Sequence, residues 1–241
     1  MTGHSSAAEL SARLLAAGDT RDFTTVNDFA RATGWLHGPM VTYAGQGVAL
    51  FAVLLIVGYL LARAAQRPLM LARALLAGAG ALLAVAVNQP IVHAVNEPRP
   101  YTQLPHALLL VHRSMDASFP SDHATMAGSV AAGLLCVHRK LGAVAALAAL
   151  LMAIARVYVG AHFPFDVLAG LAVGVVVALL VQRAGPALAR LLTHLETSRL
   201  RPLLTTRTAP PPTAPAALRS DIKPGTLYPA LHRRSRPRQA R

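Results

Sequence analysis

Five long apolar stretches constrain the fold of this chain more than any other feature. They cover residues 41–61, 69–87, 124–137, 141–159 and 165–181. A helix needs about 20 apolar residues to cross the hydrocarbon core of a bilayer, and only 14% of the residues are charged, against about a quarter in a soluble domain. The sequence therefore predicts an all-α, polytopic transmembrane helical bundle with about five spans.

The segments on either side of this bundle differ from it in composition. Residues 1–40 contain two weakly amphipathic stretches, 7–17 and 23–35, which predict an interfacial helix that lies on the membrane rather than crossing it. Residues 41–183 would form the transmembrane domain. Residues 184–241 are basic and proline-rich, which predicts a largely disordered tail.

The basic residues of the linkers predict an orientation. Bases lie between the first and second spans, between the third and fourth, and after the fifth: Arg63, Arg67, Arg73, Arg139, Lys140 and the tail. The positive-inside rule places all three segments in the cytoplasm. We therefore expect a multi-pass protein of the plasma membrane with a cytoplasmic tail, and with loop 88–123 and turn 160–164 on the outer face.

The tail carries much of the positive charge of the chain. The net charge is +13, and twelve of the 23 lysines and arginines fall in residues 183–241. Such a segment suits anionic lipid headgroups as a partner, although a solvated tail that only fixes the orientation of the chain would have the same composition. No nucleic-acid-binding motif accompanies it, so we do not expect nucleic acid to be a partner.

Three polar segments border the outer ends of the predicted spans. In the first, Pro98 and Pro100 hold Arg99 in an extended chain, where its guanidinium suits a phosphate. In the second, Ser121 or Asp122 begins a helix whose free N–H groups suit an anion. His123 follows and is placed to donate a proton. Taken singly, these are also the features of an interfacial arginine and an ordinary helix cap.

The third segment contains an oriented histidine. His162 and Asp166 are four residues apart, with Pro164 at the start of a helix and Arg156 at the end of the helix before. A carboxylate at this spacing can fix the tautomer of the imidazole, although such a pair can also simply brace a helix start. Because all three segments would meet on one membrane face, together they predict an anion site with a nucleophile and a proton donor.

These segments resemble the motifs of a known family. The pattern Arg156-x5-His162-x3-Asp166 resembles the third motif of the type-2 phosphatidic acid phosphatases (PAP2), which are related to vanadium haloperoxidases. Residues 119–123 resemble the second motif, with Asp122 where glycine is usual, and Arg99-Pro100 resembles the end of the first. The resemblance extends over residues 23–183 and implies a PAP2/haloperoxidase-like bundle.

The resemblance also implies a role for each matching residue. His162 would be the nucleophile that forms a phosphohistidine, Asp166 would orient it, and His123 would protonate the leaving group. The phosphoryl oxygens would be held by Arg99, Arg156 and Ser121. Because fixed cations already stabilise the transferring group, we expect neither a metal nor another cofactor.

One position departs from the family pattern. The first motif usually has a lysine seven residues before its arginine, and here that residue is Val92. His93 is adjacent, but we expect it to point elsewhere on the helix. The loss of this charge favours a non-catalytic, anion-binding homologue, whereas the intact His162, Asp166 and His123 favour an enzyme.

The substrate expected from the resemblance is a lipid phosphate. Residues 118–125 and the preceding His106 and His112 are similar to those of bacterial undecaprenyl-diphosphate phosphatases, which implies release of phosphate from undecaprenyl diphosphate. Phosphatidic acid and phosphatidylglycerophosphate remain alternatives, because prenyl and acyl grooves are both merely apolar. A cation transporter would need ionisable residues at mid-membrane, and here they lie at the ends of the spans.

Overall fold

The computed structural model describes residues 7–195, which form helices joined by turns and one long loop. In chain order, the elements are α1 (Ala7–Ala32), a 3-10 turn (Gly34–Leu36), α2 (His37–Ala65), α3 (Pro68–Val95), α4 (Pro100–Gln103), α5 (Asp122–Val137), α6 (Arg139–Tyr158), α7 (Pro164–Gln182) and α8 (Gly185–Leu195). The expected all-α bundle is confirmed. The predicted tail has 58 residues, 184–241, and the structure describes it only as far as residue 195.

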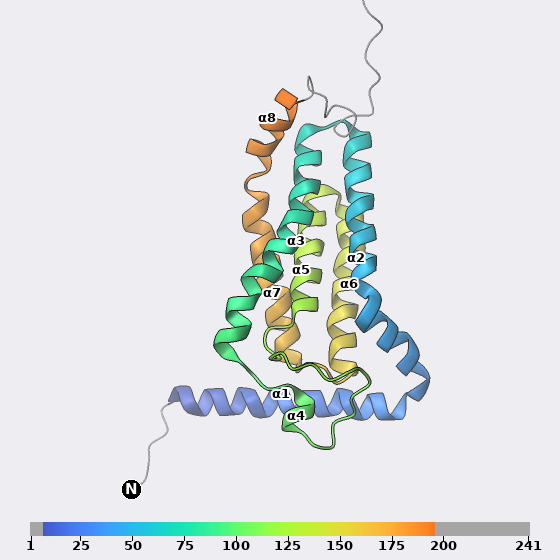
Figure 1. Ribbon diagram of the computed structural model, residues 1–241, viewed down its shortest axis with the longest axis vertical. Helices are drawn as coiled ribbons and strands as arrows, with labels where there is room; N and C mark the ends of the chain where they lie inside the picture. The colour runs from blue at the N-terminus through green and yellow to red at the C-terminus, as the bar shows by residue number, and fades with distance from the viewer. Residues whose placement is uncertain (1–6, 196–241) are drawn as a thin grey trace, which may run out of the picture. The chain divides into compact units, whose positions relative to one another are not determined.

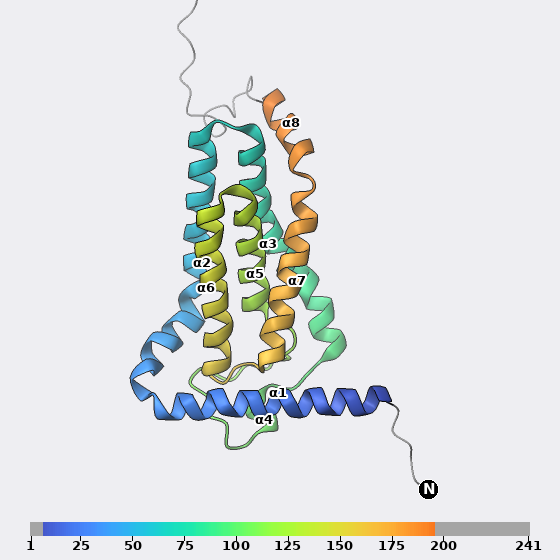
Figure 2. The same cartoon turned by 180° about the vertical axis from the view of Figure 1, so that it is seen from behind.

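The five predicted spans correspond to α2, α3, α5, α6 and α7, which run roughly side by side (Figures 1 and 2). Helix α5 is the centre of the bundle and packs against α7, α6 and α3. Most of its residues are buried, including Val130 and Leu134. The catalytic motifs predicted from the sequence lie at the end of the bundle where α5 begins.

Four segments in the described part of the chain are long and apolar enough to cross a membrane: Gly34–Ala65, Pro68–Gln103, Arg139–Tyr158 and Pro164–Gln182. The remaining predicted span, α5, has 16 residues, fewer than the roughly 20 that cross a bilayer. Large apolar side chains cover the outer faces of the surrounding helices, among them Ile56, Leu82, Leu147 and Leu168. An exposed apolar surface of this extent is typical of contact with lipid.

Helix α3 continues eight residues beyond the predicted limit of its apolar stretch, to Val95. Pro90 lies inside it. A proline removes one backbone hydrogen bond and bends a helix, and α3 curves away from the bundle over this last part (Figure 1). Asn96 ends the helix in the left-handed conformation, with φ 48°, and turns the chain towards Arg99.

Helix α1 runs across the end of the bundle that holds the predicted site (Figures 1 and 2). Its Phe23, Asn27 and Ala30 are buried, so one face packs on the bundle while Phe29 on another face is exposed. Within the predicted interfacial segment of residues 1–40, Ala7–Ala32 form a helix, and α2 begins inside the segment, at His37.

Part of the predicted disordered tail is helical instead. Helix α8 starts at Gly185 and buries Ala189 and Leu192 in the core of the bundle. These apolar residues, three apart, lie on one face of a helix, and that face packs against α3. The predicted domain boundary at 183/184 thus falls at the turn between α7 and α8. The proline-rich residues from about 205 lie outside the described residues.

The packing of α5 against α7 depends on glycines. A Cβ atom at Gly174 would lie 2.0 Å from the carbonyl oxygen of Thr125, and one at Gly128 would lie 2.6 Å from that of Leu171. Backbones approach this closely only where side chains are absent. This contact also fixes the relative position of the two helix starts, Asp122 and Pro164, that border the site.

We expect Gly174→Ala to destabilise the protein, because the added methyl would force α5 and α7 apart. Overpacking of this kind costs about 1–3 kcal/mol. Gly78→Ala is the matched control, since no atom lies within 4 Å of a Cβ at that position, and it should leave stability unchanged or slightly higher. Thermal unfolding of both variants in detergent would measure the difference. Equal melting temperatures would contradict the packing argument.

Candidate active site

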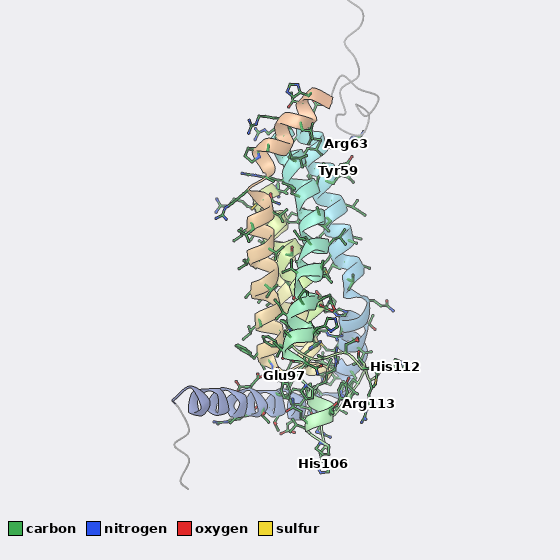
Figure 3. The ribbon with its side chains drawn as sticks, turned by 60° about the vertical axis from the view of Figure 1, so that its left-hand side comes forward. Tyr59, Arg63, Glu97, His106, His112 and Arg113 are labelled. Atoms are coloured by element: carbon green, nitrogen blue, oxygen red, sulfur yellow. The ribbon has the colours of Figure 1, made fainter. Side chains whose placement is uncertain are left out.

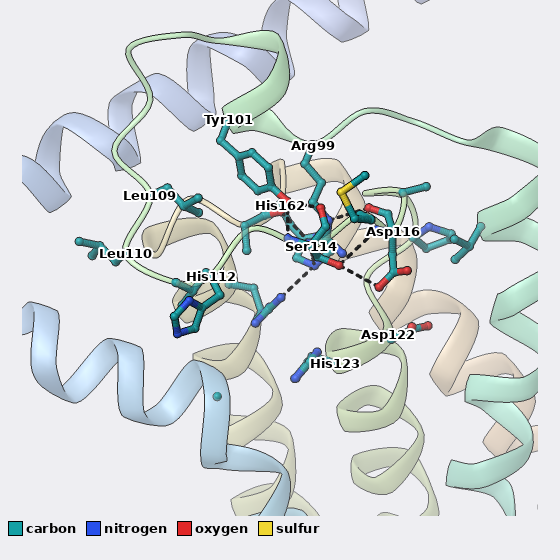
Figure 4. Close-up of a pocket in the computed structure, with 18 of the residues that line it drawn as sticks. Arg99, Tyr101, Leu109, Leu110, His112, Ser114, Asp116, Asp122, His123 and His162 are labelled. Atoms are coloured by element: carbon teal, nitrogen blue, oxygen red, sulfur yellow. Dashed lines mark hydrogen bonds between the residues drawn. The ribbon is translucent and has the colours of Figure 1, made fainter.

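A polar cleft of about 1070 Å³ lies at the α1 end of the bundle. The first part of α2, the last part of α3, loop 109–117, the start of α5 and the turn between α6 and α7 line it. Four residues predicted from the sequence face this cleft: Arg99, His123, Arg156 and His162. Figure 4 shows Arg99, His123 and His162 converging on it from three segments that are far apart in the chain.

The turn that carries His162 is held tightly between α6 and α7. Gly160 has φ 79°, a backbone conformation that favours glycine, and a Cβ there would lie 2.2 Å from the carbonyl oxygen of Leu108. Pro164 then begins α7, as prolines commonly begin helices. His162 itself is only 3% exposed, so its ring is fixed by the protein around it.

Two guanidinium groups contact the same nitrogen of His162. Arg99 Nη1 and Arg156 Nη2 each lie 3.3 Å from His162 Nε2, and Figure 4 shows contacts of this cluster as dashed lines. Both arginines donate N–H groups, so the compatible imidazole accepts at Nε2 and carries its proton on Nδ1. In this tautomer the lone pair of Nε2 points towards the two guanidiniums and the cleft.

The other nitrogen of His162 is held mainly by Ser118. His162 Nδ1 lies 2.9 Å from the Ser118 carbonyl oxygen and 3.5 Å from Asp166 Oδ2. The carbonyl is therefore the better acceptor for the Nδ1 proton. Asp166 takes part in the same arrangement, since its Oδ2 accepts hydrogen bonds from the Ser118 hydroxyl and, at 2.8 Å, from the Phe163 backbone N–H.

Ser118 is thus a functional residue that the sequence reasoning quoted within a motif but assigned no role. It is fully buried, and its backbone N–H donates to the Glu97 carbonyl oxygen at 2.7 Å. Ser118 joins His162, Asp166 and the segment before Arg99. Its position beside the second motif was the available signal, but only the folded chain shows which atoms it contacts.

Burial and the neighbouring cations keep His162 neutral. Burial, together with the charges of Arg156 and Arg99, lowers the pKa of the imidazole to about 4, although the hydrogen bond with Asp166 acts in the opposite direction. Transfer of the ring from water disfavours its charged form. At neutral pH, Nε2 therefore carries a free electron pair.

The two arginines are positioned by backbone carbonyl groups. Arg99 Nε donates to the Asp116 oxygen at 2.8 Å and its Nη1 donates to the Ala161 oxygen at 3.2 Å. Arg156 Nη1 lies 3.4 Å from the Ala44 oxygen, and its Nε has no hydrogen-bond partner among the described residues. Neither forms a salt bridge within the described part of the chain, so both positive charges remain available to an anion.

Not every residue predicted for the site faces the cleft. Asp166 is buried behind His162. Ser121 begins α5, as expected, but its side chain makes no capping hydrogen bond. It is fully buried and does not line the cleft, and its Oγ has no partner among the described residues. The structure thus brings together five of the six predicted residues, His162 and four neighbours, whereas the hydroxyl of Ser121 is buried and outside the lining of the cleft.

Asp122, which replaces the usual glycine, is bound by α3. Its Oδ1 accepts hydrogen bonds from Asn88 Nδ2 at 2.8 Å and Gln89 Nε2 at 2.9 Å. Asn88 also donates to the Pro120 carbonyl oxygen at 3.0 Å. The two amides stabilise the carboxylate by these hydrogen bonds and fix the start of α5, which carries His123. The sequence reasoning did not single out either amide.

The position of the missing lysine is apolar in the structure. Val92 lines the cleft and is almost buried, so no cation stands there. His93 lines the cleft as well, which corrects the expectation that it would point elsewhere. The bend of α3 beyond Pro90 displaces this turn from the line of an ideal helix, on which that expectation relied.

No group of three or more histidine, cysteine, aspartate or glutamate side chains within the described residues is arranged to hold a metal ion. Two carboxylates, Asp116 and Asp122, also line the cleft, but its fixed positive charges are a pair of guanidiniums, Arg99 and Arg156. Such a set suits the oxygens of a phosphoryl group.

Comparison with known proteins agrees with this geometry. The PAP2 superfamily profile matches residues 73–190, which include the six predicted site residues and Ser118. The bacitracin transport permease protein BcrC of Bacillus licheniformis is 30% identical over 166 residues, covering 69% of this chain and 80% of the relative. The chain belongs to the PAP2 superfamily.

Two further PAP2 relatives are similar over much of the chain. The undecaprenyl-diphosphatase BcrC of Bacillus subtilis is 29% identical over 161 residues, or 67% of this chain and 81% of the relative. A transmembrane PAP2-type phosphatidylglycerolphosphate phosphatase from Bacillus subtilis shares the fold, with a TM-score of 0.50 at 24% identity over 78% of this chain and 90% of that one. The protein is therefore a multi-pass membrane member of the PAP2 phosphatase family.

We expect the ring of His162 to titrate near pH 4 in the absence of ligand. Its pKa is lowered from 6.5, so the folded state binds fewer protons than the unfolded chain between these values. The contribution to stability is complete above about pH 6.5 and is lost as the pH falls towards 4. Nitrogen-15 NMR of the histidine rings would measure the midpoint, with His162→Gln assigning the signal. A midpoint near 6.5 would contradict the neutral imidazole.

Proposed function

We propose that this PAP2 phosphatase hydrolyses undecaprenyl diphosphate to undecaprenyl phosphate and inorganic phosphate through a phosphohistidine at His162. The observation that carries the proposal is the Nε2 atom of His162, which lies 3.3 Å from a nitrogen of each of two guanidiniums. A phosphoryl group held by those two cations would place its phosphorus next to this free electron pair. The nucleophile and the two stabilising cations would therefore act on the same phosphoryl group.

The first step transfers the phosphoryl group to the protein. Nε2 of His162 forms a bond to the terminal phosphorus as the bond from that phosphorus to the bridging oxygen breaks. The negative charge of the bound diphosphate favours the protonated form of His123, which gives its proton to the bridging oxygen, and that oxygen leaves with the prenyl phosphate. His123 suits this role because it faces the same cleft from the first turn of α5.

The second step releases phosphate. Water attacks the phosphorus and passes a proton to His123, and the P–N bond breaks to restore neutral His162. Arg99 and Arg156 hold the phosphoryl oxygens throughout, while Ser118 and Asp166 retain the Nδ1 side of the ring. The hydroxyl of Ser121, which has no partner among the described residues, remains a predicted third contact.

The prenyl diphosphate is favoured over other lipid phosphates by similarity and by charge. One relative of about 30% identity is named as an undecaprenyl-diphosphatase, and the sequence of residues 118–125 resembles that group. A diphosphate also brings more negative charge than a monoester into a cleft whose two arginines form no salt bridge with any carboxylate among residues 7–195. Val92 removes one cation from the family pattern, but it leaves every group of the two steps in place.

Phosphate release by the purified full-length protein in detergent, with EDTA present, tests the reaction. We expect faster release from undecaprenyl diphosphate than from phosphatidic acid. Preference for phosphatidic acid would move the function to phospholipid metabolism, and no release from either lipid would support a non-catalytic homologue.

His162→Ala tests the nucleophile in the same assay. We expect turnover to fall by roughly three orders of magnitude or more, the scale seen when a catalytic nucleophile is removed. His106→Ala is the matched control, because His106 is exposed and projects away from the bundle (Figure 3). Trapping of an acid-labile phosphate on wild-type protein, absent from His162→Ala, would identify the intermediate, and near-normal turnover of the variant would exclude this nucleophile.

We also propose that the cleft faces the outside of the cell. Figure 3 shows Arg63 at the end of the bundle opposite to Glu97, His106 and Arg113. The positively charged linkers predicted to be cytoplasmic therefore lie away from the cleft, as the positive-inside rule requires for an outward-facing site. An outer site suits a diphosphate carrier that is released on that face.

A reporter fused after residue 183, or at the end of the full chain, tests this orientation. We expect activity of a cytoplasmic reporter and none of a reporter that needs export. The opposite pattern would place the cleft in the cytoplasm, while leaving the chemistry of His162 unaffected.

A further inference from the structure

Helix α1 makes contacts that the proposed reaction does not yet explain. It lies outside the region that matches the PAP2 profile, which begins at residue 73. Three of its residues, Asp19, Phe23 and Asn27, are spaced four apart and therefore share one face of the helix. All three contact the turn that carries His162 or the loop beside that turn.

Asp19 caps helix α7 from outside that helix. Its Oδ1 accepts a hydrogen bond from the Phe165 backbone N–H at 2.9 Å. The first N–H groups of a helix have no partner within it, and at this helix start Asp166 already accepts from the Phe163 N–H. Asp19 accepts a hydrogen bond from a second of these N–H groups, that of Phe165, the residue before Asp166.

Phe23 and Asn27 hold the chain on the other side of His162. The ring of Phe23, which is 1% exposed, lies edge-on to Phe163 with 5.4 Å between centroids. Asn27 forms two hydrogen bonds of 2.9 Å with the backbone of Leu108, one donated and one accepted. The Leu108 oxygen in turn lies where a side chain on Gly160 would be.

We propose that this face of α1, formed by Asp19, Phe23 and Asn27, is a clamp that positions residues 159–166 for phosphoryl transfer. The clamp acts through the backbone of Phe165, the ring of Phe163 and the backbone of Leu108. Asp19, Phe23 and Asn27 are positioning residues, since none of them lines the cleft. The inference rests on the proposed function, because it assigns the clamp to the His162 turn of that reaction.

The surroundings of Asp19 support a specific contact. The carboxyl is half-buried, and burial raises its pKa, with Asp166 and Asp22 adding to the rise and the hydrogen bond from Phe165 opposing it. Glu97 is a further carboxyl that interacts electrostatically with Asp19. A carboxylate kept among like charges needs a compensating donor, which here is the Phe165 N–H.

Asp19→Ala in the full-length protein tests the clamp by two measurements. We expect kcat for phosphate release from undecaprenyl diphosphate to fall about tenfold, because small displacements of a reacting group cost this much or more. KM should change less than twofold, because Arg99 and Arg156 are untouched. Hydrogen exchange in the peptide covering residues 159–168 should become faster than in wild type.

Two variants separate positioning from loss of charge. Asp19→Asn keeps an oxygen that can accept from Phe165 and should restore most of kcat. Asp22→Ala removes the same charge from an exposed position on α1 and should match wild type in both measurements. Asn27→Ala should act like Asp19→Ala, with Thr25→Ala, an exposed neighbour, as its control.

The outcomes distinguish this proposal from the function on which it rests. If wild type releases phosphate but Asp19→Ala does so equally well, the clamp has no part in the reaction. If Asp22→Ala lowers kcat as much as Asp19→Ala, the effect is one of charge and the clamp is overturned. If wild type hydrolyses no lipid phosphate, the proposed function fails, and unchanged exchange in Asp19→Ala would overturn the clamp independently.

Discussion

The active end of this protein depends on holding two guanidiniums beside one neutral imidazole. Arg99 and Arg156 both reach the same nitrogen of His162, and within the described residues neither has a carboxylate partner. Backbone oxygens of Asp116, Ala161 and Ala44 accept hydrogen bonds from the two guanidiniums and so hold them in place against their mutual repulsion. A multiply charged anion such as a lipid phosphate would balance these two positive charges.

The rest of the fold keeps this cluster from relaxing. Glycines let α5 and α7 approach until backbone meets backbone, and this contact fixes the starts of both helices at the cleft. The amides of Asn88 and Gln89 join α3 to the start of α5, and α1 supports the turn between α6 and α7. A preorganised site of this kind stabilises charge in the transition state without reorganising as the reaction proceeds.

Much of this could be predicted from the sequence. The apolar stretches gave the five bundle helices, and the motif residues Arg99, His123, Arg156, His162 and Asp166 do meet at one end. Contacts made by backbone atoms could not be predicted. The Ser118 carbonyl, rather than a carboxylate, is the nearest acceptor for His162 Nδ1, and no side-chain pattern encodes a carbonyl group.

Some expectations from the sequence differ from the structure because tertiary packing overrides the local sequence pattern. Residues 185–195 read as the start of a basic tail, yet they form a helix because Ala189 and Leu192 find a partner surface on the bundle. His93 was expected to face away, but the bent end of α3 places it at the cleft. Ser121 begins α5 as its motif predicts, and its role as a phosphate contact stays a prediction.

The sequence by itself determined that this chain is a membrane bundle and which residue types its chemistry uses, because apolar length and motif spacing are local properties. Only the tertiary structure decided which nitrogen of His162 is free, what holds the other one, and that α1 packs against the catalytic turn. Those features depend on distances between segments up to 146 residues apart, as between Asp19 and Phe165. Such distances are fixed by the packing of the whole bundle rather than by any stretch of it.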